Sequence, residues 1–269
     1  MTAKSLSLPA RFIRLARLAL HALRAWWILH VVFPRTDAAR HDAEIRVWSR
    51  KLLRVLGINL HIIDPPEYLP TQAVLVSNHV SWLDIFVIYA QTPGLFIAKS
   101  EVREWPLIGG LIGKVGTLFI ERGSPRHARA INSQMRDAIV SGRLMCLFPE
   151  GTTTEGDELK PFKAALLQPA VEVGATVIPV ALRYVQASGE RNIAPNYAGD
   201  TTLMESLWRI VSHPDIQAEL RFLSPVDIAP TEERRSLARR TEELIAEALA
   251  LPTPRKGIDI GDDLPGESQ

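Results

Sequence analysis

The residues best suited to chemistry are His79 and Asp84, in the segment Ser77 to Asp84, which follows the apolar run Ala73 to Val76. A base and a carboxylate at the end of a buried strand are typical of a catalytic pair. On one helix, positions five apart are separated by roughly 140° and do not share a face. We therefore expect the chain to turn at Asn78 or His79 and to become helical after it, with Asn78 or the residue before it as N-cap.

In this arrangement Asp84 would hold one imidazole nitrogen and leave the other to accept a proton, so His79 would be a general base. A second interpretation is a capped helix on which the two residues are merely polar neighbours. A metal site is the weakest interpretation, because the chain has seven histidines and the other six are scattered, with no second ligand at zinc-type spacing.

The chain offers no evident nucleophile of its own. Its one cysteine, Cys146, lies inside the apolar run Leu144 to Phe148 and is expected to be a buried, unreactive strand residue. A single cysteine allows no disulfide within the chain, which fits a reducing compartment. No Gly-x-Ser-x-Gly elbow is present. If His79 is a base, the group that it activates belongs to the substrate; a serine hydrolase using Ser77 or Ser81 is the alternative, and it predicts labelling by a fluorophosphonate.

Composition limits the function classes further. With 269 residues, 46% apolar content and a net charge of +1, the chain can form one sizeable catalytic domain with an accessory segment. The balanced charge argues against nucleic acid as the main partner. However, residues 1–35 contain Lys4 and five arginines but no acidic residue, which points to an anionic surface such as a membrane.

The same region contains the apolar stretch Leu18 to Phe33, which is shorter than the roughly 20 residues of a full membrane span. Arg24 interrupts it, at a cost of about 2.5 to 3.5 kcal/mol for insertion. Trp26 and Trp27 suit the headgroup level. We expect a helix lying in the membrane interface, with an ordinary core-packing helix as the alternative. A second helix, from Asp37 to Val55, would complete a hairpin.

From Ile58 onward strand-like and helix-like stretches alternate, which predicts an α/β fold. The predicted strands are Asn59 to Ile63, Ala73 to Val76, Leu95 to Ala98, Thr117 to Ile120, Leu144 to Phe148, Val177 to Leu182 and Glu219 to Leu223. The predicted helices are Pro125 to Val140, Phe162 to Val173 and a capped helix from Thr231 to Leu249. Pro169 should kink or shorten its helix, and Pro179 should place its strand at an edge or a bulge.

Three more clusters contain candidate binding residues. Arg122 ends a strand beside a predicted helix start, which suits an anion clamp, although a solvated strand end would look the same. Phe148 to Thr152 is expected to form a strand followed by a tight turn, whose amides can bind an oxyanion or a phosphate. The alternative is an ordinary exit from a strand into a loop. Lys160 and Lys163 follow, and a solvated loop is the simplest explanation for them.

Taken in order, these segments resemble the glycerophospholipid acyltransferase family, which includes 1-acylglycerol-3-phosphate acyltransferases. The matching blocks are Asn78-His79-(four residues)-Asp84, Gly116-Thr-Leu-Phe-Ile-Glu-Arg122, Phe148-Pro-Glu-Gly-Thr152 and Val177-Ile-Pro-Val180. The resemblance covers Ala73 to Tyr184. It implies a mixed central sheet flanked by helices and an N-terminal membrane-associating helical hairpin. The implied division is residues 1–57 for the membrane helices, 58–251 for the catalytic domain and 252–269 for a disordered tail.

The same resemblance implies the roles of the site residues. His79 would be the catalytic base and Asp84 its orienting partner. The residues implied to bind substrate or shape the pocket are Asn78, Gly116, Arg122, Glu150, Gly151, Thr152 and Lys163. A lysolipid would be the acceptor, and a thioester of acyl carrier protein or coenzyme A the donor, with no cofactor or metal. The expected location is the cytoplasmic face of the inner membrane.

One departure from the family pattern concerns the acceptor. Many lysophosphatidate acyltransferases continue the third block with Arg-Ser, whereas this chain has Thr153 and Thr154. Loss of a bidentate phosphate donor there leaves Arg122, Lys160 and Lys163 to hold a phosphate, or indicates another head group. We expect 1-acyl-glycerol-3-phosphate as the acceptor, with lyso-ornithine lipid a close second. A membrane-bound lipid-binding protein with a decayed site is the alternative from another class.

Overall fold

The structure, a computed structural model, describes residues 5–100, 117–120 and 125–254. Gly116, Arg122 and most of the predicted tail lie outside these residues. The described strands are β1 (Ile58–Ile63), β2 (Ala73–Ser77), β3 (Leu95–Lys99), β4 (Leu118–Ile120), β5 (Met145–Leu147), β6 (Thr176–Val185) and β7 (Ile216–Phe222). The α-helices are α1 (Leu8–Trp27), α2 (Ala38–Leu56), α3 (Asp84–Tyr89), α5 (Pro125–Val140), α6 (Gln168–Val173), α7 (Leu203–Ser212) and α8 (Arg234–Leu249).

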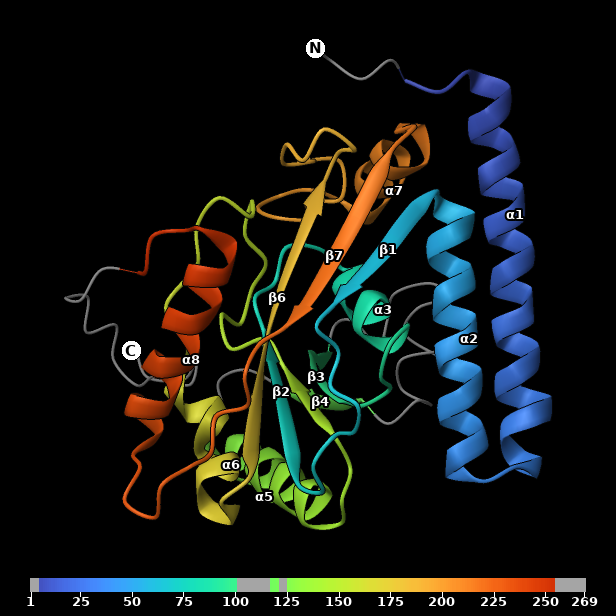
Figure 1. Ribbon diagram of the computed structural model, residues 1–269. Coiled ribbons are helices and arrows are strands. Elements are labelled where there is room, and N and C mark those ends of the chain that lie inside the picture. Colours follow the sequence, from blue (N-terminus) through green and yellow to red (C-terminus); the bar gives the residue numbers. More distant parts are fainter. Residues whose placement is uncertain (1–4, 101–116, 121–124, 255–269) are drawn as a thin grey trace.

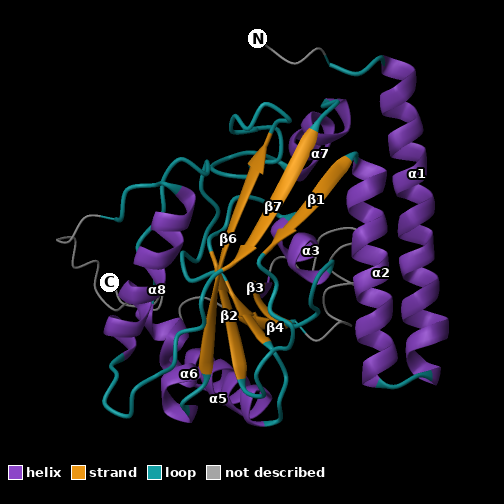
Figure 2. Cartoon of the chain, viewed as in Figure 1, coloured by secondary structure: helices purple, strands orange, loops and turns teal. Residues whose placement is uncertain are grey.

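The strands form one seven-stranded sheet in the order β1-β7-β6-β2-β5-β3-β4 (Figure 1). All neighbours are parallel except β6 and β7, which are antiparallel. Helices cover both faces: α2, α3 and α7 pack in one core cluster, and α5, α6 and α8 in the other (Figure 2). The predicted mixed α/β fold is therefore confirmed.

The central strand β2 explains why its sequence is an uninterrupted apolar run. Leu75 packs into the cluster on one face of the sheet, and Val74 and Val76 pack into the cluster on the other. A strand that is covered on both faces needs apolar residues at every position. Each predicted strand is present, with no end displaced by more than three residues.

Of the two alternatives predicted for Pro179, the edge position is wrong, because β6 lies inside the sheet between β2 and β7. Pro179 pairs with Val76 of β2 on one side, whereas regular pairing with β7 begins one residue later, at Val180 opposite Phe222. Proline lacks only a backbone donor, and its carbonyl still accepts a hydrogen bond from the N–H of Leu223 at 2.9 Å. Beyond Pro179, β6 pairs again at Val177 opposite Val226, with one extra residue on the partner side relative to Val180 opposite Phe222. The second alternative, a bulge at Pro179, therefore agrees with the structure.

The N-terminal helices form the predicted hairpin, although α1 begins at Leu8 rather than Leu18. α1 continues through a π-helical turn, Ile28–Val32, and a 3₁₀ turn, Phe33–Arg35. His21 of α1 and Trp48 of α2 stack at a centroid distance of 4.5 Å, and each side chain hydrogen-bonds to the other residue's backbone carbonyl. This double contact fixes the two helices against each other.

The outer face of α1 is apolar and exposed. Its exposed large side chains are Leu8, Phe12, Ile13, Leu20, Leu23, Trp26 and Trp27. By length and composition alone, residues 8–35 form one helical segment that is long and apolar enough to cross a membrane. Only 22% of its most apolar window is buried inside the protein, so most of this apolar surface has no protein partner in the described chain.

Two other helices differ from the predictions. α7 was not expected, although Thr202 and Glu205 form a capping box at its start, a signal that the sequence contains. α8 begins at Arg234, three residues after the predicted cap at Thr231, and its N-cap Glu233 makes no side-chain cap bond. The predicted effect of Pro169 is confirmed: a 3₁₀ turn precedes it, and α6 begins only at Gln168.

Candidate active site

The candidate site lies at the carboxyl end of β2, in the loop that leads to α3. His79 Nδ1 and Asp84 Oδ2 are 2.8 Å apart, so the predicted pair is in contact. The side chain of Asp84 is fully buried, whereas 18% of the His79 side chain is exposed. The imidazole is thus held from the protein interior and presented toward the outside.

The loop differs from the expected helix start. α3 begins at Asp84 itself, and neither Ser77 nor Asn78 is its N-cap. Asp84 Oδ2 accepts the backbone N–H groups of Val80 at 2.7 Å and Ser81 at 2.9 Å in addition to His79. The chain therefore wraps around the carboxylate before it becomes helical, which lets two residues five apart meet.

The hydrogen bonds of Asp84 define the protonation pattern of the pair. Its second oxygen, Oδ1, accepts the hydroxyl of Tyr184 at 2.8 Å. Two backbone N–H groups and a phenol all donate to this carboxyl group, which is the environment of an ionised acceptor. Nδ1 of His79 then carries the proton shared with Asp84, and Nε2 is left as the proton acceptor.

The face of the imidazole is also fixed. The ring of Phe148 lies parallel to that of His79, with a centroid distance of 4.0 Å and an interplanar angle of 9°. Phe148 stacks in turn on Phe96 at 5.4 Å. The hydrogen bond to Asp84 at the ring edge and the stacking of Phe148 on the ring face together fix the orientation of the imidazole.

Glu150 supports the loop through its backbone. Oε1 accepts the N–H of His79 at 2.7 Å, and Oε2 accepts the N–H of Lys160 at 2.9 Å. The residue is only 2% exposed. Burial raises the pKa of Glu150 to about 7, although the two backbone hydrogen bonds act in the opposite direction. The structure thus places this predicted substrate-binding residue where both oxygens bond within the protein.

Asn78 is placed in a similar way. Its side-chain oxygen accepts the N–H of Leu182 at 2.8 Å, and its side-chain nitrogen donates to the carbonyl of Leu182 at 2.9 Å. The backbone pairing of β2 with β6 ends at Ser77 opposite Val180. The amide of Asn78 therefore replaces the next pair of the ladder and anchors the loop to β6.

The Glu-Gly-Thr turn brings a cation close to its backbone. Gly151 has φ +69°, and a Cβ atom there would lie 2.8 Å from Nζ of Lys163. The turn is closed by hydrogen bonds from Gly151 N–H to the Phe148 carbonyl and from Lys163 N–H to the Pro149 carbonyl. Glycine thus provides both the left-handed conformation and the space for Lys163, while its own N–H is used within the turn.

The residues after Gly151 form hydrogen bonds to neighbouring loops. Thr152 is partly buried, and Thr154 N–H donates to the His79 carbonyl at 2.9 Å. The Thr153 hydroxyl donates to the carbonyl of Tyr197. The position at which many family members have arginine therefore has a packing role here. Among the described residues, no group of three or more His, Cys, Asp or Glu side chains is arranged to hold a metal ion.

The described site brings together most of the predicted residues. His79, Asp84, Asn78 and the Glu150 to Thr152 turn converge at the carboxyl ends of β2 and β5, with Lys163 beside the turn. Sequence reasoning missed Tyr184 as a partner of Asp84, because that contact joins positions 100 residues apart and no local pattern marks it.

Comparison with known proteins agrees with this geometry. Residues 62–183 match the protein-family model described as Acyltransferase. Over 250 residues the chain is 37% identical to a 1-acyl-sn-glycerol-3-phosphate acyltransferase of Neisseria meningitidis, covering 93% of this chain and 97% of that protein. The chain belongs to the acyltransferase family. The family resemblance inferred from the four sequence blocks is thus confirmed.

Other relatives of this acyltransferase have a different name. It is 36% identical over 251 residues to a lyso-ornithine lipid O-acyltransferase of Pseudomonas aeruginosa, covering 91% of this chain and 94% of the relative. The solved structure of a 1-acyl-sn-glycerophosphate acyltransferase from Thermotoga maritima matches with a TM-score of 0.62 and 21% identity. That match covers 88% of this chain and 96% of the solved one, and it supports the fold. Overall identity does not separate the two kinds of acceptor.

Proposed function

We propose that this acyltransferase moves a fatty acyl chain from a thioester to the free hydroxyl of a lysolipid, with His79 as the general base. The observation that carries the proposal is the 2.8 Å contact between His79 Nδ1 and the buried carboxylate of Asp84, which leaves Nε2 to accept a proton. The names of its relatives, which are acyltransferases of lysolipids, point to the same reaction class.

The surrounding side chains argue against a nucleophile supplied by the protein. Ser77 and Ser81 are both fully buried. The Ser77 hydroxyl donates to the Asn78 carbonyl, and the Ser81 hydroxyl accepts the N–H of Leu83. Burial raises the pKa of the Cys146 thiol far above its ordinary range, so its thiolate is scarce at neutral pH. These positions favour direct transfer over an acyl-enzyme.

In the proposed step, Nε2 of His79 removes the hydroxyl proton as the substrate oxygen attacks the thioester carbonyl carbon. The new C–O bond forms a tetrahedral oxyanion, the C–S bond then breaks, and the imidazolium returns its proton to the leaving thiolate. Asp84 stabilises the imidazolium throughout. The donor, an acyl carrier protein or a coenzyme A thioester, supplies the energy of the reaction.

Lys163 is the described cation that best suits a phosphate-bearing acceptor. Gly151 lets its ammonium group approach the turn that also holds the catalytic loop through Thr154. A positive charge at this place favours 1-acyl-glycerol-3-phosphate as the acceptor. Lyso-ornithine lipid is the second candidate, because Thr153 bonds to Tyr197 where an arginine would otherwise face the phosphate, and because a lyso-ornithine acyltransferase is 36% identical.

The apolar outer face of α1 supports association with a membrane, where both the lysolipid and its product reside. Its exposed Trp26 and Trp27 suit the headgroup region, and Arg17 and Arg24 are exposed on the same helix. We place the enzyme on the cytoplasmic face of the inner membrane, where anionic lipid would attract these arginines.

The test compares the wild type with His79→Ala in vesicles, using lysophosphatidate or lyso-ornithine lipid with a single acyl donor. We expect His79→Ala to lower kcat by about a thousandfold with an unchanged melting temperature. His61→Ala is the matched control, because His61 lies on β1 and bonds to Gln217, away from the site. A His79→Ala enzyme with wild-type activity would refute the proposal. Faster turnover of lyso-ornithine lipid would select the second acceptor.

A further inference from the structure

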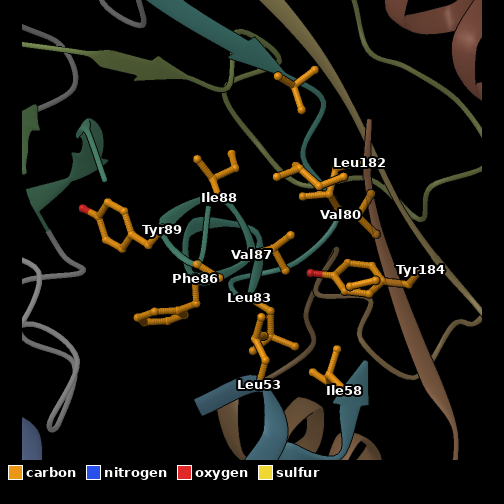
Figure 3. Close-up of a cluster of buried hydrophobic side chains, with 14 of the residues drawn as sticks. Leu53, Ile58, Val80, Leu83, Phe86, Val87, Ile88, Tyr89, Leu182 and Tyr184 are labelled. Carbon is orange, nitrogen blue, oxygen red and sulfur yellow. The ribbon is translucent and has the colours of Figure 1, made fainter. Parts of the chain in front are cut away.

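Tyr184 reaches the catalytic pair from the opposite side of the loop. It lies on β6 and is 2% exposed, and its hydroxyl donates to Asp84 Oδ1 at 2.8 Å. In the close-up of the core, its ring lies beside α3 with the hydroxyl directed toward that helix (Figure 3). The contact joins the strand that follows the site to the first residue of the helix that carries the carboxylate.

Toward Asp84 the phenol acts as a donor. Burial raises the pKa of Tyr184 well above its ordinary value, and the neighbouring charge of Asp84 raises it further. An ionised phenolate therefore does not form in the working pH range, and the neutral O–H is directed at a carboxylate oxygen.

The two carboxylate oxygens of Asp84 have different hydrogen-bond partners. Oδ2 is shared by His79 Nδ1 and the backbone N–H groups of Val80 and Ser81, whereas Oδ1 accepts the hydroxyl of Tyr184. A carboxylate can turn about its Cβ–Cγ bond and exchange its oxygens. The phenol on Oδ1 opposes that rotation and draws negative charge away from Oδ2.

We propose that Tyr184 is a positioning residue of this acyltransferase, which aligns Asp84 with His79 and moderates the basicity of the imidazole through the carboxylate. The inference rests on the proposed function of His79 as general base. Without the phenol, Asp84 concentrates more charge on Oδ2, binds the imidazolium more strongly and makes His79 a base that deprotonates only at higher pH.

Several described charged or titratable groups surround this arrangement. Asp84 comes from α3 and Tyr184 from β6, while Glu150 bonds to the His79 backbone and Lys160 bonds to Glu150. Lys163 lies at the Gly151 turn. The change from tyrosine to phenylalanine at position 184 alters none of these charges, so a shift of the pH profile reports on the phenol itself.

The chain supplies a matched control in Tyr89. Tyr89 is also 2% exposed, belongs to the same core cluster and lies at the other end of α3. Its hydroxyl lies near Thr117 but has no hydrogen-bond partner among the described residues. In Figure 3 it points away from α3, on the side opposite Tyr184. Tyr89→Phe removes a buried hydroxyl from the same core without touching Asp84.

The experiment measures kcat, KM, melting temperature and the pH profile of kcat for full-length Tyr184→Phe and Tyr89→Phe enzymes in vesicles. We expect Tyr184→Phe to lower kcat about tenfold, to change KM less than twofold, and to move the acidic limb of the profile to higher pH. Tyr89→Phe should keep the wild-type kcat and profile. If Tyr184→Phe keeps the wild-type kcat and pH profile, the inference is wrong. It is also wrong if the substitution changes only KM or lowers only the melting temperature.

A second substitution covers the case in which Tyr184→Phe does not fold. Incorporation of 3-fluorotyrosine at position 184 keeps the ring and makes the phenol a stronger donor. We expect the acidic limb to move to lower pH, opposite to the effect of phenylalanine, and no shift would overturn the inference. A fully active His79→Ala enzyme would instead refute the proposed function, so the two failures are distinguishable.

Discussion

Glu150 accepts a hydrogen bond from the backbone N–H of His79 at 2.7 Å, so the acid of one sequence block holds the histidine of another. The contact crosses 71 positions of the chain and joins the carboxyl ends of the adjacent parallel strands β2 and β5. Through this bond the second block supplies an acceptor that keeps the first block in place.

The buried carboxyl of Glu150 predicts a pH-dependent stability. Its pKa is near 4.5 when unfolded and about 7 when folded. The folded protein therefore retains a proton that the unfolded chain has lost, and this contribution is complete below pH 4.5 and lost as the pH rises through about 7. The difference corresponds to at most about 3 kcal/mol. Urea unfolding in detergent between pH 5 and 8 should show a decline that is clearly smaller in Glu150→Gln; an equal decline would contradict this assignment.

The parallel stack of His79 and Phe148 predicts a kinetic effect of Phe148→Leu. Leucine keeps the apolar contact with Phe96 but removes the aromatic face, which is worth about 0.5 to 1.5 kcal/mol in orientation. We expect kcat to fall by a factor of about two to thirteen with little change in KM. Steady-state kinetics in vesicles test this, and a kcat equal to wild type would show that the hydrogen bond to Asp84 alone orients the ring.

The close approach of Lys163 to Gly151 predicts a loss of acceptor binding in Gly151→Ala. A methyl group at this position meets Nζ at 2.8 Å and Cε at 3.0 Å, so the lysine must move. The left-handed backbone adds about 1 kcal/mol of strain. Gly174→Ala is the matched control, because Gly174 has φ +64° and open space around its Cβ position. KM for lysophosphatidate should rise several-fold in Gly151→Ala only; a similar rise in both variants would assign the effect to strain.

The apolar face of α1 predicts that Leu23→Glu weakens membrane binding. Leu23 is 64% exposed, and exchanging a leucine in contact with lipid for a charged residue costs more than about 1.4 kcal/mol. Vesicle co-sedimentation should therefore show at least a tenfold loss of partitioning. Val140→Glu at the end of α5, where the valine is 56% exposed, serves as the control. Equal partitioning of the two variants would exclude α1 as the binding face.

Much of this fold was predictable because its signals are local. The apolar run of β2 follows from burial on both faces, and the ends of the strands are marked by glycine, proline and charged residues. The start of α7 was overlooked despite the capping box of Thr202 and Glu205, because its apolar residues span only ten positions. For Pro179 the sequence left an edge and a bulge as alternatives and could not decide between them, because the neighbours of β6 are a tertiary property.

The residues of the candidate site could be predicted from the sequence, but the contacts that each of them makes could not. The sequence indicates that His79 and Asp84 must meet, yet it does not show that the chain wraps around the carboxylate first. Asn78 and Glu150 were expected to bind substrate or to shape the pocket, and their polar atoms bond to backbone groups beside the ends of the strands. Long-range hydrogen bonds of this kind have no periodicity in the sequence.

The bonds that fix Asp84 all originate inside the protein, from its own backbone, His79 and Tyr184. The proposed catalytic pair is therefore held by the protein itself, and none of these hydrogen bonds requires a group from a lipid. The Thr153 hydroxyl bonds to the carbonyl of Tyr197 and not to the pair, so a change at this partly buried position leaves the bonds of Asp84 in place. A scaffold built in this way can acquire new lipid specificities by changes in loop residues alone. The turn that follows Gly151 is therefore the segment to vary in engineering.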